Sequence, residues 1–154
     1  SIFEMSIVKQ KMSASELLDD IYKNVKMGAD SIINLLSRVK DEGERVEMTR
    51  QLDGYERLAQ KASRMMNEIG MKPKEESAMA RASAKIGMSM NTMIDSSSSH
   101  IAEMMVQGST MGVTDMLRKI TEAQEQGIRG EVIALAREVA DFEQHAAERM
   151  KAYL

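Results

Sequence analysis

Apolar residues recur along most of the chain at steps of three and four, which places them on one face of an α-helix. The first stripe predicts a helix that starts at the capping box of Ser13 and Glu16 and is ended by Gly43. Its apolar positions are Leu18, Ile21, Val25, Ile32, Leu36 and Val39. No segment shows the alternating pattern of a β-strand, so the pattern predicts an all-α fold.

Two further stripes predict a second helix and a last helix, both long. The second ends at Gly70 and Pro73, and the last follows the glycine-containing stretch EQGIRG. A short connection makes the first and second helices antiparallel neighbours. The second stripe consists of Met48, Leu52, Tyr55, Ala59, Ala62, Met66 and Ile69, and the last of Ile128, Val132, Leu135, Val139, Phe142, Ala146 and Met150.

The middle of the chain predicts a third helix that begins near Glu75. This helix must break before Gln124, because an unbroken helix would be much longer than the helices that pack against it. Gly108 and Gly112 in QGSTMG are the favoured break, followed by a short helix over residues 113–125 with the apolar stripe Val113, Leu117 and Ile120. The serine quartet Ser96–Ser99 is the alternative, since serine hydroxyls compete for backbone carbonyls and bend helices.

The expected architecture is an antiparallel four-helix bundle of long helices plus one short helix. Residues 13–154 form a single helical-bundle domain, and residues 1–12 form an N-terminal arm that is either ragged or docked. Whether the third helix breaks at Ser96–Ser99 or at Gly108–Gly112, and how the short helix packs, stays open at this point.

Composition narrows the class of function. The net charge of −3 does not resemble the basic footprint of a nucleic-acid-binding protein. No apolar run approaches the roughly 18 residues that a membrane span needs. The absence of cysteine excludes disulfides and thiolate metal sites. We therefore expect a cytoplasmic protein that binds neither nucleic acid nor membrane.

Methionine is abundant, with 16 residues against three tyrosines and two phenylalanines. Its flexible side chain fills irregular gaps in cores and repacks against varied partners. Self-association, in the simplest case as a dimer, or binding to another protein is the role that this composition favours.

His100, in the stretch DSSSSHIAEMM, is the first candidate for chemistry because the chain has only two histidines. It shares a predicted stripe with Met93 and Met104. A structural histidine that bonds a serine or a carbonyl is the favoured interpretation, and a metal ligand or proton carrier is the alternative. Its spacing from Glu103 is the reverse of a Glu-x-x-His motif.

The four-helix layout resembles the ferritin-like superfamily in the number and length of its helices. That resemblance implies a di-iron site built from glutamates and two Glu-x-x-His motifs, but this sequence contains no such motif. A degenerate site would draw on carboxylates of several helices. The metal candidates are His100, Glu103, Glu56, Asp53, Asp30 and Asp95, with Glu138 and Asp141 as a similar pair on the last helix.

The stretch SHIAEMMVQGSTMGVTDM is also similar to segments of small uncharacterised bacterial helical proteins, a likeness that implies no activity. There is no Gly-x-Ser-x-Gly elbow and no P-loop lysine, so no enzymatic constellation is indicated. We expect a non-catalytic bundle without a cofactor. The alternative is a ferritin-like protein that binds a divalent metal.

Overall fold

The computed structural model describes the backbone of residues 2–73 and 97–154, and the side chains of residues 14–73 and 97–154. These residues form α1 (Ile2–Leu36), α2 (Glu42–Glu68), α4 (Ser98–Glu125), α5 (Glu131–Met150) and the 3₁₀ turn η1 (Lys151–Tyr153). They contain no β-strand. The predicted all-α class is confirmed.

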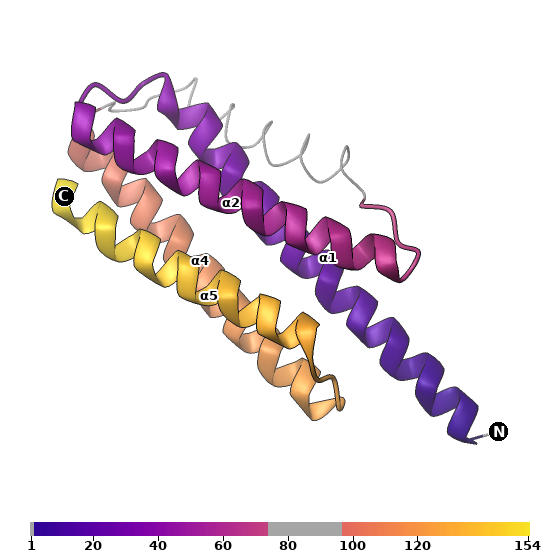
Figure 1. Ribbon diagram of the computed structural model, residues 1–154. Coiled ribbons are helices and arrows are strands. Elements are labelled where there is room, and N and C mark those ends of the chain that lie inside the picture. The colour runs from indigo at the N-terminus through magenta and orange to yellow at the C-terminus, as the bar shows by residue number, and fades with distance from the viewer. Residues whose placement is uncertain (1, 74–96) are drawn as a thin grey trace.

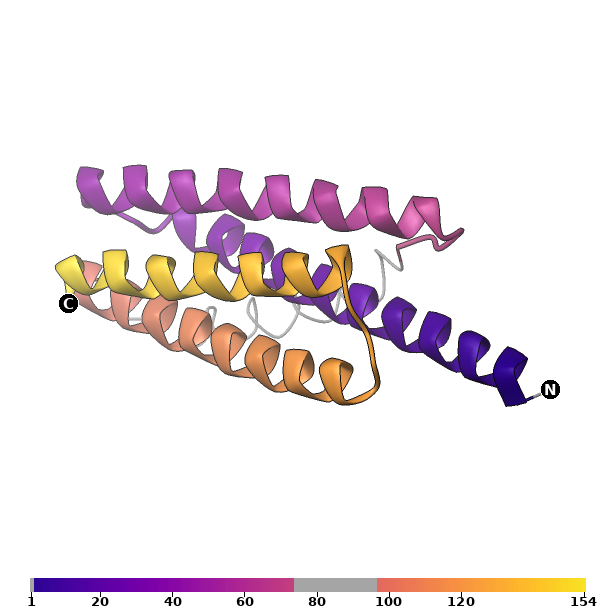
Figure 2. The ribbon, with the colours of Figure 1, turned by 60° about the horizontal axis from the view of Figure 1, so that its bottom comes forward.

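The helices pair as two hairpins, α1–α2 and α4–α5, which pack together as a four-helix bundle (Figure 1). Helix α4 lies beside α1 and α5 lies beside α2, and each helix is antiparallel to these neighbours (Figure 2). Helix α2 ends and α4 begins at opposite ends of the bundle. The predicted antiparallel bundle is therefore confirmed. None of the described helices is both long and apolar enough to cross a membrane.

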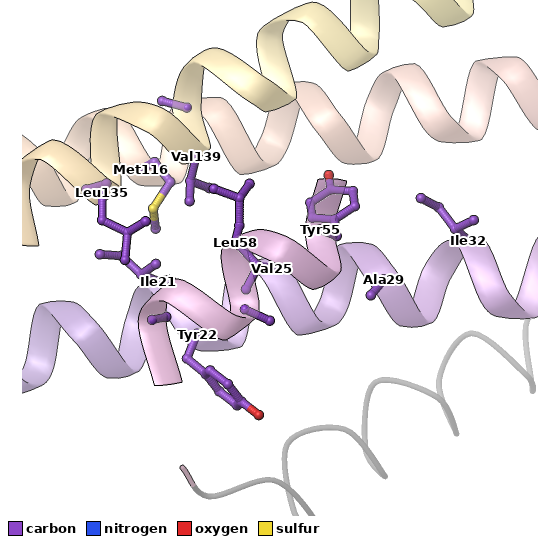
Figure 3. Packing of buried hydrophobic residues seen from close by; sticks show 14 of the residues in the cluster. Ile21, Tyr22, Val25, Ala29, Ile32, Tyr55, Leu58, Met116, Leu135 and Val139 are labelled. Carbon is purple, nitrogen blue, oxygen red and sulfur yellow. The ribbon is translucent and has the colours of Figure 1, made fainter. Parts of the chain in front are cut away.

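The core lies between the hairpins and is supplied by one stripe from each helix (Figure 3). Leu117 and Ile69, which the pattern predicted to face inward, are instead 53% and 36% exposed. The stripe of α4 runs through Met116 and Ile120, so Leu117 points away from it. The predicted stripe residues that are buried include Leu18, Ile21, Val25, Ile32, Met48, Tyr55, Ala62, Met66, Leu135, Val139 and Met150.

Helix α1 begins at Ile2, so the prediction that it starts at Ser13 is wrong. Ser13 and Glu16 lie inside a continuous helix. No glycine or proline occurs between residues 2 and 27 to interrupt it. Residues 2–12 are thus the first turns of α1.

Gly43 does not end α1, contrary to the prediction. Helix α1 ends at Leu36, and Val39 is buried in the connection. Gly43 instead lies in the first turn of α2, whose N-cap is Asp41. The Asp41 carboxylate accepts a hydrogen bond from the Glu44 amide at 2.9 Å, which satisfies one of the free donors at the helix start.

Helix α4 begins at the serine quartet. Ser97 is the N-cap of α4, and its Oγ accepts a hydrogen bond from the His100 amide at 3.2 Å. Gly108 and Gly112 lie inside α4, so the favoured break there is wrong, and residues 113–125 are not a separate short helix. The start of the predicted third helix at Glu75 lies outside the described residues.

Two of the helix glycines mark where helices approach most closely. A Cβ at Gly28 of α1 would lie 2.3 Å from the ring of Tyr55, and a Cβ at Gly54 of α2 would lie 2.3 Å from the ring of Phe142. The two rings meet edge to face, with centroids 4.9 Å apart and planes at 76°. The two rings therefore connect α1, α2 and α5. Each ring occupies space that a side chain larger than that of glycine would fill.

We predict that Gly28→Ala lowers the free energy of unfolding although alanine is the better helix former. Displacing the Tyr55 ring should cost about 1–3 kcal/mol, more than the roughly 1 kcal/mol gained in helix propensity. Urea unfolding monitored by circular dichroism measures the change. Gly108→Ala is the matched control, because no atom lies within 4 Å of its added Cβ, and it should stabilise the protein by about 0.5–1 kcal/mol. Equal effects at both positions would contradict the close contact.

Candidate functional site

His100 lies at the start of α4, at the end of the bundle where α1 meets α2 (Figure 1). Its side chain is 39% exposed, and its Nδ1 is 3.8 Å from Oε2 of Glu103, one turn later on the same helix. This is a partly exposed pair of neighbours, which the sequence spacing by itself produces. The structural interpretation of His100 remains the favoured one.

The other metal candidates are dispersed. Asp53 and Glu56 are exposed on α2, whereas Asp30 is buried on α1. Asp95 lies outside the described residues. Among the residues that the structure describes, no three histidine, aspartate or glutamate side chains are placed to hold a metal ion together. Metal binding stays a prediction without a located site.

The corresponding pair on the last helix is also on the surface. Glu138 forms an ion pair with Lys61, with 2.6 Å between Oε1 and Nζ, and both side chains are about half exposed. Asp141 is exposed, and its backbone oxygen lies 2.8 Å from Nδ1 of His145. These groups belong to a solvated face, where ion pairs contribute little to stability.

The polar group that the fold places at its centre is Glu143 of α5. Its side chain is 2% exposed, and Oε2 accepts a hydrogen bond from the Tyr55 hydroxyl at 2.8 Å. Tyr55 is 3% exposed and comes from α2, so this bond joins the two hairpins. Figure 3 shows its hydroxyl directed toward the α4–α5 side of the core. Oε1 of Glu143 has no hydrogen-bond partner among the described residues.

Helices α4 and α1 complete the surroundings of this carboxyl. A Cβ at Gly112 would lie 2.4 Å from Oε2 of Glu143, so the glycine makes room for the carboxyl group. The Asn24 amide of α1 donates to the Gly112 carbonyl at 3.3 Å and also lies within bonding reach of Glu143. Ser109, buried on α4, bonds the Tyr55 hydroxyl. All four helices therefore contribute to one polar cluster: Asn24, Tyr55, Ser109, Gly112 and Glu143.

Burial controls the ionisation of this cluster. It raises the pKa of Glu143 from 4.5 to about 8, with a smaller contribution from the charge of Asp115. Hydrogen bonds from Tyr55 and Asn24 favour the ionised form but do not offset desolvation. The pKa of Tyr55 is raised well above 10, again mainly by burial and then by Glu143. At neutral pH the structure therefore holds a neutral Glu143 and a neutral Tyr55.

Glu44 is a second buried carboxyl, at the end of the bundle. Its side chain is fully buried in the first turn of α2, and neither oxygen has a hydrogen-bond partner among the described residues. Burial, followed by the charge of Asp41, raises its pKa to about 7.

These groups were not among the candidates from the sequence. Glu143 nevertheless follows Val139 by four residues and precedes Ala146 by three, which places it on the apolar stripe of the last helix. A lone acidic residue in such a stripe was the available signal. Tyr55 was predicted only as a core residue, and Gly112 only as a loop residue.

The side chains of Tyr55, Ser109 and Glu143 are almost completely buried within the described part of the chain. The groove that the structure describes lies elsewhere, between α1 and the C-terminal part of α4. It is shallow and lined by Glu16, Asp20 and Glu122, together with Lys119, which bridges Asp20 at 3.4 Å and Asp115 at 3.1 Å. What the central cluster can do chemically is bind and release a proton within a packed interface.

Comparison with known proteins adds no function. No family model matches the chain, and no curated protein or solved structure matches it. The ferritin-like resemblance therefore remains a prediction that concerns architecture alone.

We predict that Tyr55 and Glu143 stabilise the fold as a coupled pair. At pH 6, Tyr55→Phe and Glu143→Met should each lower the free energy of unfolding by about 1–3 kcal/mol, because each leaves a buried polar group with fewer partners. The double variant should lose clearly less than the sum, since it removes both polar groups together. Urea unfolding of the four proteins measures the coupling. Additive losses would show that the hydrogen bond carries no energy of its own.

Proposed function

We propose that this chain is a non-catalytic helical-bundle protein that associates with a second copy of itself through the N-terminal part of α1. The observation that carries the proposal is the projection of α1. In both overall views its N-terminal turns extend past the ends of α4 and α5 (Figures 1 and 2). A helical segment of this length is marginal in water without packing against a partner.

The sequence of the projecting segment supports an apolar contact. Six of the 12 residues from 2 to 13 are apolar, and they include the aromatic Phe3. Apolar positions at this density are unusual for a helix that remains surrounded by water. The apolar residues are Ile2, Phe3, Met5, Ile7, Val8 and Met12.

The order of charges favours a second copy in antiparallel orientation. Along α1 the charges run from Glu4, through Lys9 and Lys11, to Glu16, which is acidic, basic and acidic in turn. An antiparallel copy whose two-fold axis lies near residue 7 places the basic pair, Lys9 and Lys11, of each chain opposite Glu4 of the other. A parallel copy in register would place Lys9 and Lys11 against themselves. A two-fold interface of this kind is the commonest form of homo-oligomer.

We predict that the intact chain sediments as a dimer at micromolar concentration and that Ile7→Asp converts it to a monomer. The added carboxylate would have to be desolvated in the interface. Sedimentation velocity measures the change, and circular dichroism checks that the helical content is retained. Met111→Asp is the control, because Met111 of α4 is 72% exposed and lies outside the projecting segment, and this variant should remain dimeric.

Charge reversal tests the orientation. Lys9→Glu combined with Lys11→Glu should weaken the dimer, and adding Glu4→Lys to the same chain should restore it, because the facing charges are again opposite, with inverted sign. A wild-type protein that stays monomeric would refute self-association. A dimer unaffected by Ile7→Asp would locate the interface elsewhere.

A further inference from the structure

We propose that the Glu143 carboxyl is a proton-binding site that controls the docking of the two hairpins. The α1–α2 and α4–α5 hairpins remain docked while Glu143 is protonated and separate locally when it is ionised. This inference is independent of the proposed self-association, because it concerns the centre of the bundle and not the projecting part of α1.

The position of Glu143 is the first argument. Its bond to Tyr55 crosses from α5 to α2 in the core, where both side chains are almost completely buried. Ion pairs that cross the same interface lie on the surface, as for Lys61 with Glu138 and Lys119 with Asp20. Water screens those exposed pairs, whereas a change of charge on Glu143 acts inside a medium of low polarity.

The groups that face Glu143 are the second argument. Helix α2 contributes the Tyr55 hydroxyl, α1 contributes the neutral amide of Asn24, and α4 contributes the backbone of Gly112 and the carboxylate of Asp115. Among the described ion pairs none involves Glu143, and the positive charge of Lys119 is already engaged by Asp115. An ionised Glu143 would thus face two neutral donors and a like charge, with no cation to balance it.

The close packing is the third argument. The Glu143 carboxyl occupies the space of a Cβ at Gly112 and the residue is only 2% exposed, so bulk water does not reach the group while the helices stay in place. Hydration of an ionised carboxylate therefore requires the helices around it to move apart. The contacts that open first are those across the hairpin interface, since each hairpin is held internally by its own helix–helix packing.

The direction of the pH effect follows from linkage. The carboxyl has an ordinary pKa near 4.5 when exposed and a pKa of about 8 in the docked state, so the docked state holds one more proton between these values. Docking is strongest at the acidic end of this window and weakens as pH rises, by about tenfold per pH unit. The loss is complete once the pH exceeds about 8.

Glu44 titrates in the same direction, but its pKa is about 7. Between pH 7 and pH 8 both buried carboxyls therefore lose protons in the docked state, but Glu143 contributes the larger change in docking, about fivefold against about twofold for Glu44. The two contributions are separated by substituting each residue in turn.

The test uses thiol labelling. Because the chain has no cysteine, the label reacts only with a thiol that is introduced by substitution. Ala140→Cys places one thiol at a buried position of α5, and Ala134→Cys places one at an exposed position of the same helix. The ratio of their labelling rates gives the protection of the core at each pH, corrected for the reactivity of the thiol itself. Protection should fall about tenfold from pH 7 to pH 8, mostly through Glu143 and partly through Glu44, and level off above about pH 8.

Three variants decide the cause. In a Glu143→Gln background the protection should fall by no more than about twofold between pH 7 and pH 8, and in a Glu44→Gln background it should still fall about fivefold. Asp115→Asn removes the like charge that raises the pKa of Glu143. The pH at which the protection levels off should therefore be lower in this variant, although Glu143 itself is not substituted. A parent protein whose protection is constant over this interval, or a Glu143→Gln protein that loses protection as the parent does, would overturn the proposal. The pH dependence of urea unfolding, without any added cysteine, provides the same comparison if a cysteine variant fails to fold.

Discussion

The hydrogen bond between Tyr55 and Glu143 is the contact on which the arrangement of the helices depends. It joins a residue of α2 to a residue of α5 in the centre of the bundle, at 2.8 Å and almost without exposure to solvent. Glycines of the remaining two helices give it room, Gly28 of α1 under the tyrosine ring and Gly112 of α4 beside the carboxyl. A displacement of any of the four helices would disturb this one contact.

The pair has a particular importance in a core of this composition. Met48, Met66, Met116 and Met150 are fully buried, and methionine adapts its shape to several packings at little cost. Apolar burial stabilises the bundle but discriminates weakly between alternative alignments of the two hairpins. A buried hydroxyl and a buried carboxyl discriminate strongly, because an alignment that separates them leaves two polar groups desolvated and unpaired. The polar pair thus selects one alignment from those that the methionines tolerate.

The same features keep the central polar groups away from solvent and leave most of the other described polar groups on the surface. The central polar groups are enclosed by all four helices, and the described groove between α1 and α4 is shallow. Histidine and the exposed carboxylates are dispersed over the surface, so the described residues do not bring three metal ligands together. What the fold does present outward is the projecting end of α1 (Figure 2).

The sequence by itself determined the all-α class, the buried stripes of α1, α2 and α5, and the ends marked by Gly70 and EQGIRG, because these follow from local periodicity and from backbone freedom. It also contained Glu143 at an apolar-stripe position, but not the partner that makes this residue tolerable. Tertiary structure decided the rest. Gly108 and Gly112 are alike in sequence, yet both continue α4, and only Gly112 meets another helix. A glycine lacks a side chain whether it serves a turn or a close contact, so its role depends on what packs against it, and that is known only once the hairpins are in place.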